Sequence, residues 1–136
     1  MLGRISKHMI TTEKGNITMG FREKLEAYGV DVPTTMERLA NSEPLYLKCL
    51  DIFVADTNVE KLGAAVEQGD LRAGFEAAHA LKGVAANLGL QPFVDKISAM
   101  VEPFRSSDAS VDYKPLYEAV LQEMEQVKKL RTELGE

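Results

Sequence analysis

The feature that most constrains the fold is a set of apolar side chains that recur every three or four residues along most of the chain. Four segments show this spacing, over about 42–69, 70–89, 91–104 and 114–134. The spacing is typical of helices that bury one face. β-Branched residues never alternate over more than a few positions, so we expect no strand. Amphipathic helices joined by short connections predict an all-α fold, an antiparallel up-down four-helix bundle.

Residues that favour helix ends lie at the boundaries of these segments. Ser42 and Asp70 are typical N-caps, and each directly precedes an apolar repeat. Gly69 and Gly89 follow the repeats, in the place where helices commonly end on a glycine. Residues 56–58, Asp-Thr-Asn, interrupt the first long segment. We therefore expect that helix to kink or restart there.

One or two short helices are expected before the bundle. Residues 21–28 can form the first, and Thr34 with Glu37 three residues later is the pattern of a capping box for a second. Residues 1–19 mix polar, basic and β-branched residues and are interpreted as a peripheral leader. Residues 20–136 are then one helical domain, a usual domain size.

Composition excludes several classes of function. The net charge of −5 argues against nucleic acid as a partner, since phosphate backbones are bound by clustered Lys and Arg. No apolar run approaches the ~20 residues that cross a bilayer, and the N-terminus lacks a secretory pattern. We therefore expect a cytoplasmic protein with no membrane partner. One cysteine and two histidines offer no motif for a metal site, so no metal and no cofactor are expected.

The sequence Ala78–Gly89, AHALKGVAANLG, is the one stretch suited to chemistry. On a helix, Lys82 lies about one turn beyond His79, and Gly83 lies roughly 40° around the axis from it. Imidazole is partly unprotonated at neutral pH and is therefore nucleophilic. A nearby ammonium can neutralise the oxygens of a phosphoryl group. Glycine inside a helix costs about 1 kcal/mol relative to alanine, and room for a group docking on the ring would offset that cost.

This stretch resembles the histidine-containing phosphotransfer (HPt) domain family, whose AHxLKG core and downstream glycine it carries. The likeness extends from about Tyr28 to Leu134. It implies a phosphorelay intermediate that accepts a phosphoryl group from the aspartate of one receiver domain and passes it to another. On this likeness His79 is the phosphoacceptor, Lys82 the phosphate neighbour and Gly83 the residue that keeps the ring accessible. The receiver would bring the Mg²⁺ and the catalytic residues.

The expected partners are receiver domains of response regulators or hybrid histidine kinases. Candidate docking residues are Phe75, Ala80 and Ala86, which surround His79 on its helix. No heptad seam or large apolar patch indicates self-association, so we expect a monomer.

Two other functions stay open at this point. The chain could be an HPt-like docking module that binds a receiver or kinase without phosphotransfer, although the presence of both His79 and Lys82 disfavours this. It could instead be an enzyme, such as a phosphohistidine phosphatase or a metal-dependent bundle oxidase. A hydrolase needs an orienting acid, and the nearest acids along the chain are Glu76 and Asp95. Bundle oxidases need repeated Glu-x-x-His pairs, and only Glu76 and His79 have this spacing.

Overall fold

The computed structural model describes residues 18–135, and within them every element of regular structure is a helix. The all-α prediction is therefore confirmed. The predicted leader, residues 1–19, lies outside the described residues except for its last two. The helices are α2 (Met19–Tyr28), α3 (Val32–Arg38), α4 (Glu43–Val54), α5 (Asn58–Gln68), α6 (Leu71–Asn87), α7 (Gln91–Arg105) and α8 (Tyr113–Leu134).

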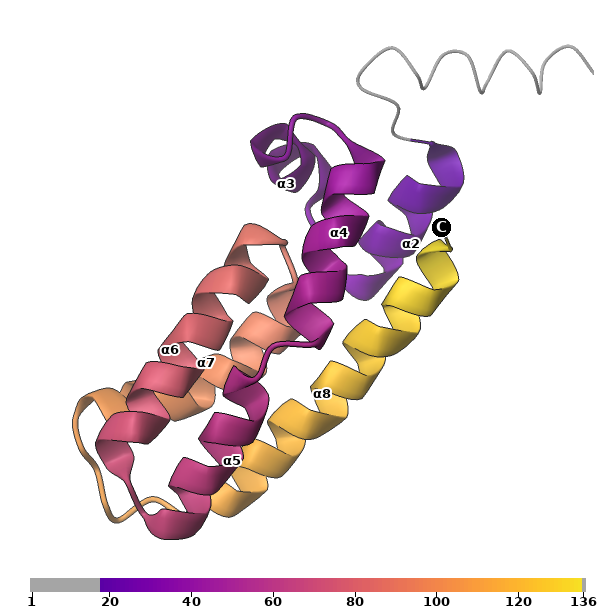
Figure 1. Cartoon of the computed structure of the whole chain (residues 1–136). Coiled ribbons are helices and arrows are strands. Elements are labelled where there is room, and N and C mark those ends of the chain that lie inside the picture. The colour runs from indigo at the N-terminus through magenta and orange to yellow at the C-terminus, as the bar shows by residue number, and fades with distance from the viewer. Residues whose placement is uncertain (1–17, 136) are drawn as a thin grey trace, which may run out of the picture.

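Four helices form the predicted antiparallel bundle (Figure 1). Helix α6 packs between α5 and α7, and α8 closes the bundle by packing against both α5 and α7. Helix α8 is the longest, with 22 residues, and extends beyond the other three to contact α4 and α2. Helices α2, α3 and α4 therefore cover the end of the bundle near the C-terminus of α8 (Figure 1).

The predicted N-caps of α4 and α6 are confirmed. The Ser42 hydroxyl accepts a hydrogen bond from the Leu45 amide at 3.1 Å, and the Asp70 carboxylate accepts one from the Ala73 amide at 3.1 Å. These side chains satisfy amides that have no partner inside the helix. The predicted interruption is also present, because α4 ends at Val54 and α5 begins at Asn58. The first predicted segment, residues 42–69, therefore forms two helices, α4 and α5.

The predicted start of α3 is wrong. The cap is Asp31 rather than Thr34, and the helix begins at Val32. The Asp31 carboxylate accepts from both the amide and the hydroxyl of Thr34, at 3.3 and 3.1 Å. Pro33 fits the first turn because its missing N–H would have no partner there. Asp31, two residues before Pro33, is therefore the N-cap of α3.

A buried tyrosine ties α4 to the end of α6. The Tyr46 hydroxyl donates to the Leu88 carbonyl at 2.7 Å, and the Tyr46 side chain is fully buried. Burial raises the pKa of Tyr46 well above its usual value, since the ionised phenolate would lose its hydration. Nearby, the rings of Phe53 and Phe93 pack edge to face at 5.0 Å and join α4 to α7.

A glycine brings α6 and α7 together. Gly74 is buried on the inner face of α6, where the ring of Phe104 packs against it. A Cβ at Gly74 would lie 2.5 Å from Cζ of Phe104, too close for any pair of carbon atoms. The Phe104 ring is itself stacked on Tyr113 at 4.1 Å, so it has little room to move. This contact fixes how α6 and α7 align along their length.

Candidate functional site

His79 lies on the outer face of α6, near the middle of the helix, and is exposed. The buried residues of α6 are Gly74, Ala77, Ala78, Leu81 and Ala85. At 100° per residue, His79 lies roughly 140° around the helix axis from the middle of this buried face, so it faces away from the core. Its helix is capped by Asp70 and held between α5 and α7. The ring is therefore presented to solvent from a rigid element.

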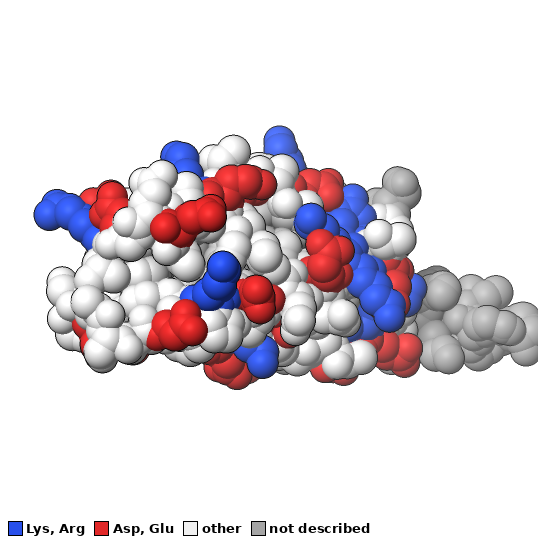
Figure 2. All heavy atoms as spheres, turned by 90° about the horizontal axis from the view of Figure 1, so that it is seen from below, with Lys and Arg blue, Asp and Glu red and all other residues white. Residues whose placement is uncertain are grey.

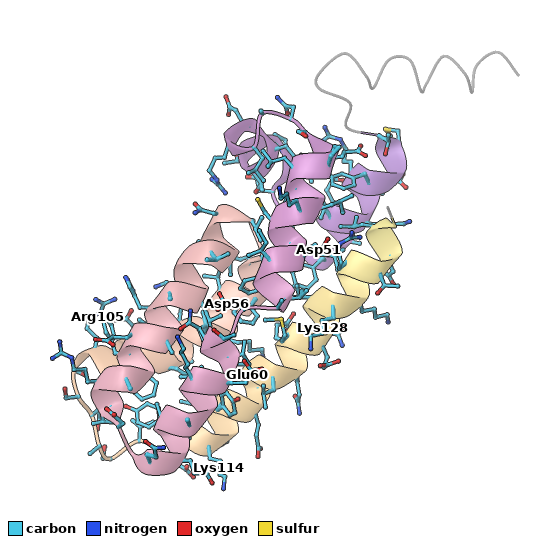
Figure 3. All side chains as sticks on the ribbon, viewed as in Figure 1. Asp51, Asp56, Glu60, Arg105, Lys114 and Lys128 are labelled. Atoms are coloured by element: carbon cyan, nitrogen blue, oxygen red, sulfur yellow. The ribbon has the colours of Figure 1, made fainter. Side chains whose placement is uncertain are left out.

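The ring of Phe75 packs against the ring of His79. The two centroids are 5.3 Å apart and the planes differ by 16°, as expected for residues four apart on a helix. The Arg105 guanidinium lies 5.2 Å from the Phe75 centroid, within range of a cation–π contact. Arg105 extends from the end of α7 beside α6 (Figure 3). Phe75, predicted as a docking residue, thus also limits the orientations of the His79 ring.

Lys82 also flanks His79, and its ammonium has an acidic neighbour. Nζ of Lys82 lies 4.0 Å from Oε2 of Glu102 on α7. The same carboxylate reaches Arg105, with Oε1 3.5 Å from Nε. Glu102 therefore joins Lys82 and Arg105 into one network. Neither Glu102 nor Arg105 was predicted from the sequence, since they lie more than twenty residues beyond His79.

The acids nearest to His79 along the chain are engaged elsewhere. The Glu76 carboxylate lies 3.4 Å from Nε of Arg72, one turn earlier on α6. The Asp95 carboxylate accepts a hydrogen bond from the Gln91 side chain at 2.8 Å. The acid that lies close to Lys82 is instead Glu102, which the packing of α7 against α6 brings there.

The surface beyond His79 is open. A Cβ built at Gly83 would meet no atom within 4 Å, and Ala80 and Ala86 are exposed. These three residues share the outer face of α6 with His79. On this side, a group attached to the imidazole, or a protein approaching it, would meet three small residues.

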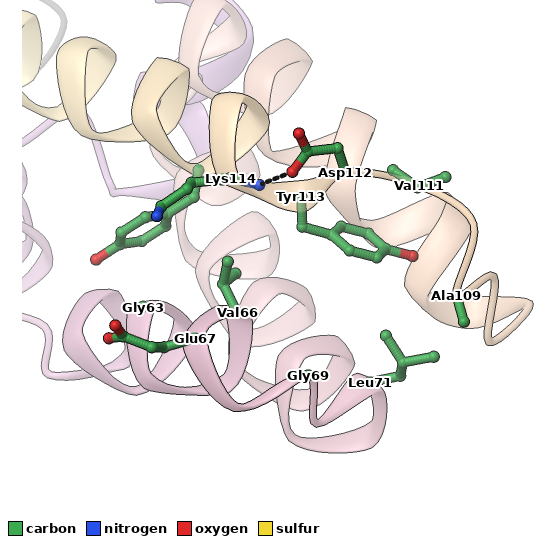
Figure 4. Close-up of a pocket in the computed structure, with 11 residues that line it drawn as sticks. Gly63, Val66, Glu67, Gly69, Leu71, Ala109, Val111, Asp112, Tyr113 and Lys114 are labelled. Atoms are coloured by element: carbon green, nitrogen blue, oxygen red, sulfur yellow. Dashed lines mark hydrogen bonds between the residues drawn. The ribbon is translucent and has the colours of Figure 1, made fainter.

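A pocket lies at the end of the bundle opposite α2, α3 and α4, where α5 ends and α8 begins (Figure 4). Its volume is about 520 Å³. The Asp112 carboxylate accepts from the Lys114 amide at 3.2 Å and caps α8 there. None of the site residues predicted from the sequence lines this pocket. Its lining residues are Gly63, Val66, Glu67, Gly69, Leu71, Ala109, Val111, Asp112, Tyr113, Lys114 and Tyr117.

Other classes of site find little support in the described part of the chain. Within residues 18–135, no group of three or more His, Cys, Asp or Glu side chains is placed to hold a metal ion. None of the helices there is long and apolar enough to cross a membrane. Figure 2 shows acidic and basic side chains interspersed on the face it displays.

Comparison with known protein families identifies the family of this chain. The sequence model of the Hpt domain matches residues 52–130, more than half of the chain. The chain belongs to the Hpt domain family. Searches of curated proteins and of solved structures returned no match. The matched range covers α5, α6, α7 and most of α8, so it includes His79 and Glu102, while α2 and α3 precede it.

Membership has direct consequences for function. Hpt domains carry phosphoryl groups on histidine in phosphorelays, and they interact with receiver domains. They are phosphocarriers. The resemblance inferred from the AHALKG stretch is therefore confirmed.

Proposed function

We propose that this Hpt domain accepts a phosphoryl group on His79 from the aspartate of one receiver domain and passes it to the aspartate of another. The exposed position of His79 on the open face of α6 is the observation that supports this most strongly. Among residues 18–135, His79 is the one histidine. It lies inside the range that matches the family.

The transfer needs a neutral imidazole. The ring nitrogen that carries no proton attacks phosphorus with its lone pair. As the N–P bond forms, the P–O bond to the receiver aspartate breaks, and the carboxylate leaves with the electron pair. The reverse step, onto a second receiver, regenerates the free imidazole. The receiver contributes the Mg²⁺ and the groups that stabilise the phosphoryl oxygens on its own side.

Two neighbours of His79 have distinct roles in this proposal. The Lys82 ammonium partly neutralises the negative charge of the bound phosphoryl group. Gly83 leaves the space that the phosphoryl group and the receiver need, because nothing lies within 4 Å of where its Cβ would be. Three further residues support these roles. Phe75 restricts the orientation of the imidazole ring by stacking on it, and the exposed Ala80 and Ala86 contact the docked receiver.

The decisive experiment is phosphoryl transfer from a receiver domain. The purified chain is incubated with a receiver phosphorylated on its aspartate, and the label is tested for acid lability and alkali stability. We expect label on the wild type and none on His79→Gln. His8→Gln is the matched control, because it removes the other histidine of the chain and should retain the label.

Two results would contradict the proposal. Equal labelling of wild type and His79→Gln, with both folded by circular dichroism, would place the phosphoryl group elsewhere. Release of free phosphate from the receiver without label on this chain would indicate a phosphatase.

A further inference from the structure

Glu102 lies between the two cations of the site and is not explained by the proposed function. Its carboxylate reaches Nζ of Lys82 at 4.0 Å and Nε of Arg105 at 3.5 Å. The Lys82 side chain is 32% exposed and that of Glu102 is 61% exposed. Both are therefore free to rearrange at the surface.

The alignment of α6 and α7 places this ion pair beside His79. Gly74 on α6 lies opposite Phe104 on α7. Because the helices are antiparallel, His79, five residues after Gly74, is level with Ala99, five residues before Phe104. Side chains on a helix lean toward its N-terminus. Lys82 therefore leans back toward His79, and Glu102 leans toward the level of Ala99, so their charged ends meet near the imidazole.

The energetics of such a pair allow exchange of partners. Exposed ion pairs contribute about 0–1 kcal/mol, so separating Lys82 from Glu102 costs little. A phosphoryl group carries about −1.5 to −2 charges near neutral pH, against −1 for a carboxylate. Once His79 is phosphorylated, the phosphoryl oxygens compete with Glu102 for the Lys82 ammonium, while Arg105 can remain with Glu102.

We infer that Glu102 is a positioning residue that weakens retention of the phosphoryl group on His79 by competing for Lys82. Its negative charge also repels the phosphoryl oxygens directly. Both effects raise the free energy of the phosphorylated carrier and favour transfer onward to the second receiver. This inference rests on the proposed function, because it concerns the stability of phosphohistidine at position 79.

The test is the equilibrium between a phosphorylated receiver and this chain. Glu102→Gln keeps the size of the side chain and removes its charge. We expect the ratio of phosphorylated to free carrier at equilibrium to rise about two- to fivefold. Glu125→Gln is the matched control, since Glu125 is an exposed glutamate that pairs with Lys128 on α8, a helix that does not carry His79. The control should shift the ratio less than twofold.

A double variant identifies the route of the effect. In a Lys82→Met background, Glu102→Gln should shift the ratio by a smaller factor than it does in the wild type, because the shared cation is gone. Equal shifts for Glu102→Gln and Glu125→Gln, or an equal shift with and without Lys82, would overturn the inference.

The outcomes separate the two proposals. If the wild type is labelled on His79 and Glu102→Gln leaves the ratio unchanged, only the role of Glu102 fails. If His79 is never labelled, the proposed function fails, and the inference about Glu102 fails with it. Thermal unfolding of each variant shows that the compared proteins are folded.

Discussion

Two glycines on the same helix show how differently the two faces of α6 are constrained. Gly74 is buried, and a Cβ there would lie 2.5 Å from the Phe104 ring. Gly83, nine residues later, is exposed, and a Cβ there would meet nothing within 4 Å. Both lie inside the helix, where glycine is less stable than alanine by about 1 kcal/mol.

The packing of the bundle explains one of these glycines and not the other. Gly74 allows α7 to approach, so its cost is offset by the contact with Phe104. At Gly83 no contact within the described chain offsets the cost. The open surface next to His79 is therefore a feature that folding does not require, as expected where a partner protein must approach.

Substitution at Gly74 should have the largest effect on stability. Gly74→Ala should lower the free energy of unfolding by about 1–3 kcal/mol, since Phe104 must move and is stacked on Tyr113. Urea unfolding followed by circular dichroism measures this. An unchanged or increased stability would mean that α7 can shift freely and that the two glycines are equivalent.

The buried Tyr46, which ties α4 to the end of α6, should influence the stability at high pH. The pKa of Tyr46 is raised by burial, while in the unfolded chain the phenol ionises near pH 10. Above pH 10 the unfolded state therefore binds fewer protons than the folded state, and the free energy of unfolding falls as the pH rises. Tyr28 has its pKa raised too, by burial and by its hydrogen bond to Glu123, and adds to the same loss.

Tyr46→Phe tests this assignment. It should cost about 1–2 kcal/mol at neutral pH, because the Leu88 carbonyl loses its buried donor. It should also make the loss of stability above pH 10 less steep. Unfolding in urea between pH 7 and pH 11 gives both values. The same slope in wild type and variant would show that the Tyr46 phenol does not contribute.

The smallest effect on stability, and of opposite sign, is expected at Gly83. Gly83→Ala should raise the free energy of unfolding by about 0.5–1 kcal/mol, because alanine favours the helix and meets no clash. Urea unfolding measures this change.

Gly83→Gln should remain folded and slow transfer from the receiver about tenfold, since its side chain covers the approach to His79. Rapid-quench measurement of the transfer rate checks this. An unaltered rate would mean that the receiver does not approach over Gly83.

The sequence allowed the helices and their order to be predicted because those depend on local spacing and capping. Each of these signals depends only on residues close together along the chain. They are the apolar repeat, the caps Ser42 and Asp70, and the break at residues 56–58. The predicted start of α3 was wrong because Thr34 was taken as the cap, whereas Asp31, three residues earlier, caps the helix. Pro33, which fits the first turn of a helix, is the local signal for the earlier start.

The surroundings of His79 were predictable only in part, for a different reason. Lys82 and Gly83 lie within one turn of His79, so helix geometry alone places them near it. Glu102 and Arg105 come from α7, and their position depends on how Phe104 packs on Gly74. Such an alignment between two helices is not visible in the periodicity of either one.

The most direct test of the central claim is to locate the phosphoryl group in the intact chain. After transfer from a phosphorylated receiver, digestion at alkaline pH and mass spectrometry with fragmentation that preserves the N–P bond can assign the modified residue. We predict one phosphoryl group, on His79. A phosphoryl group on His8, or on any residue outside the outer face of α6, would contradict the account.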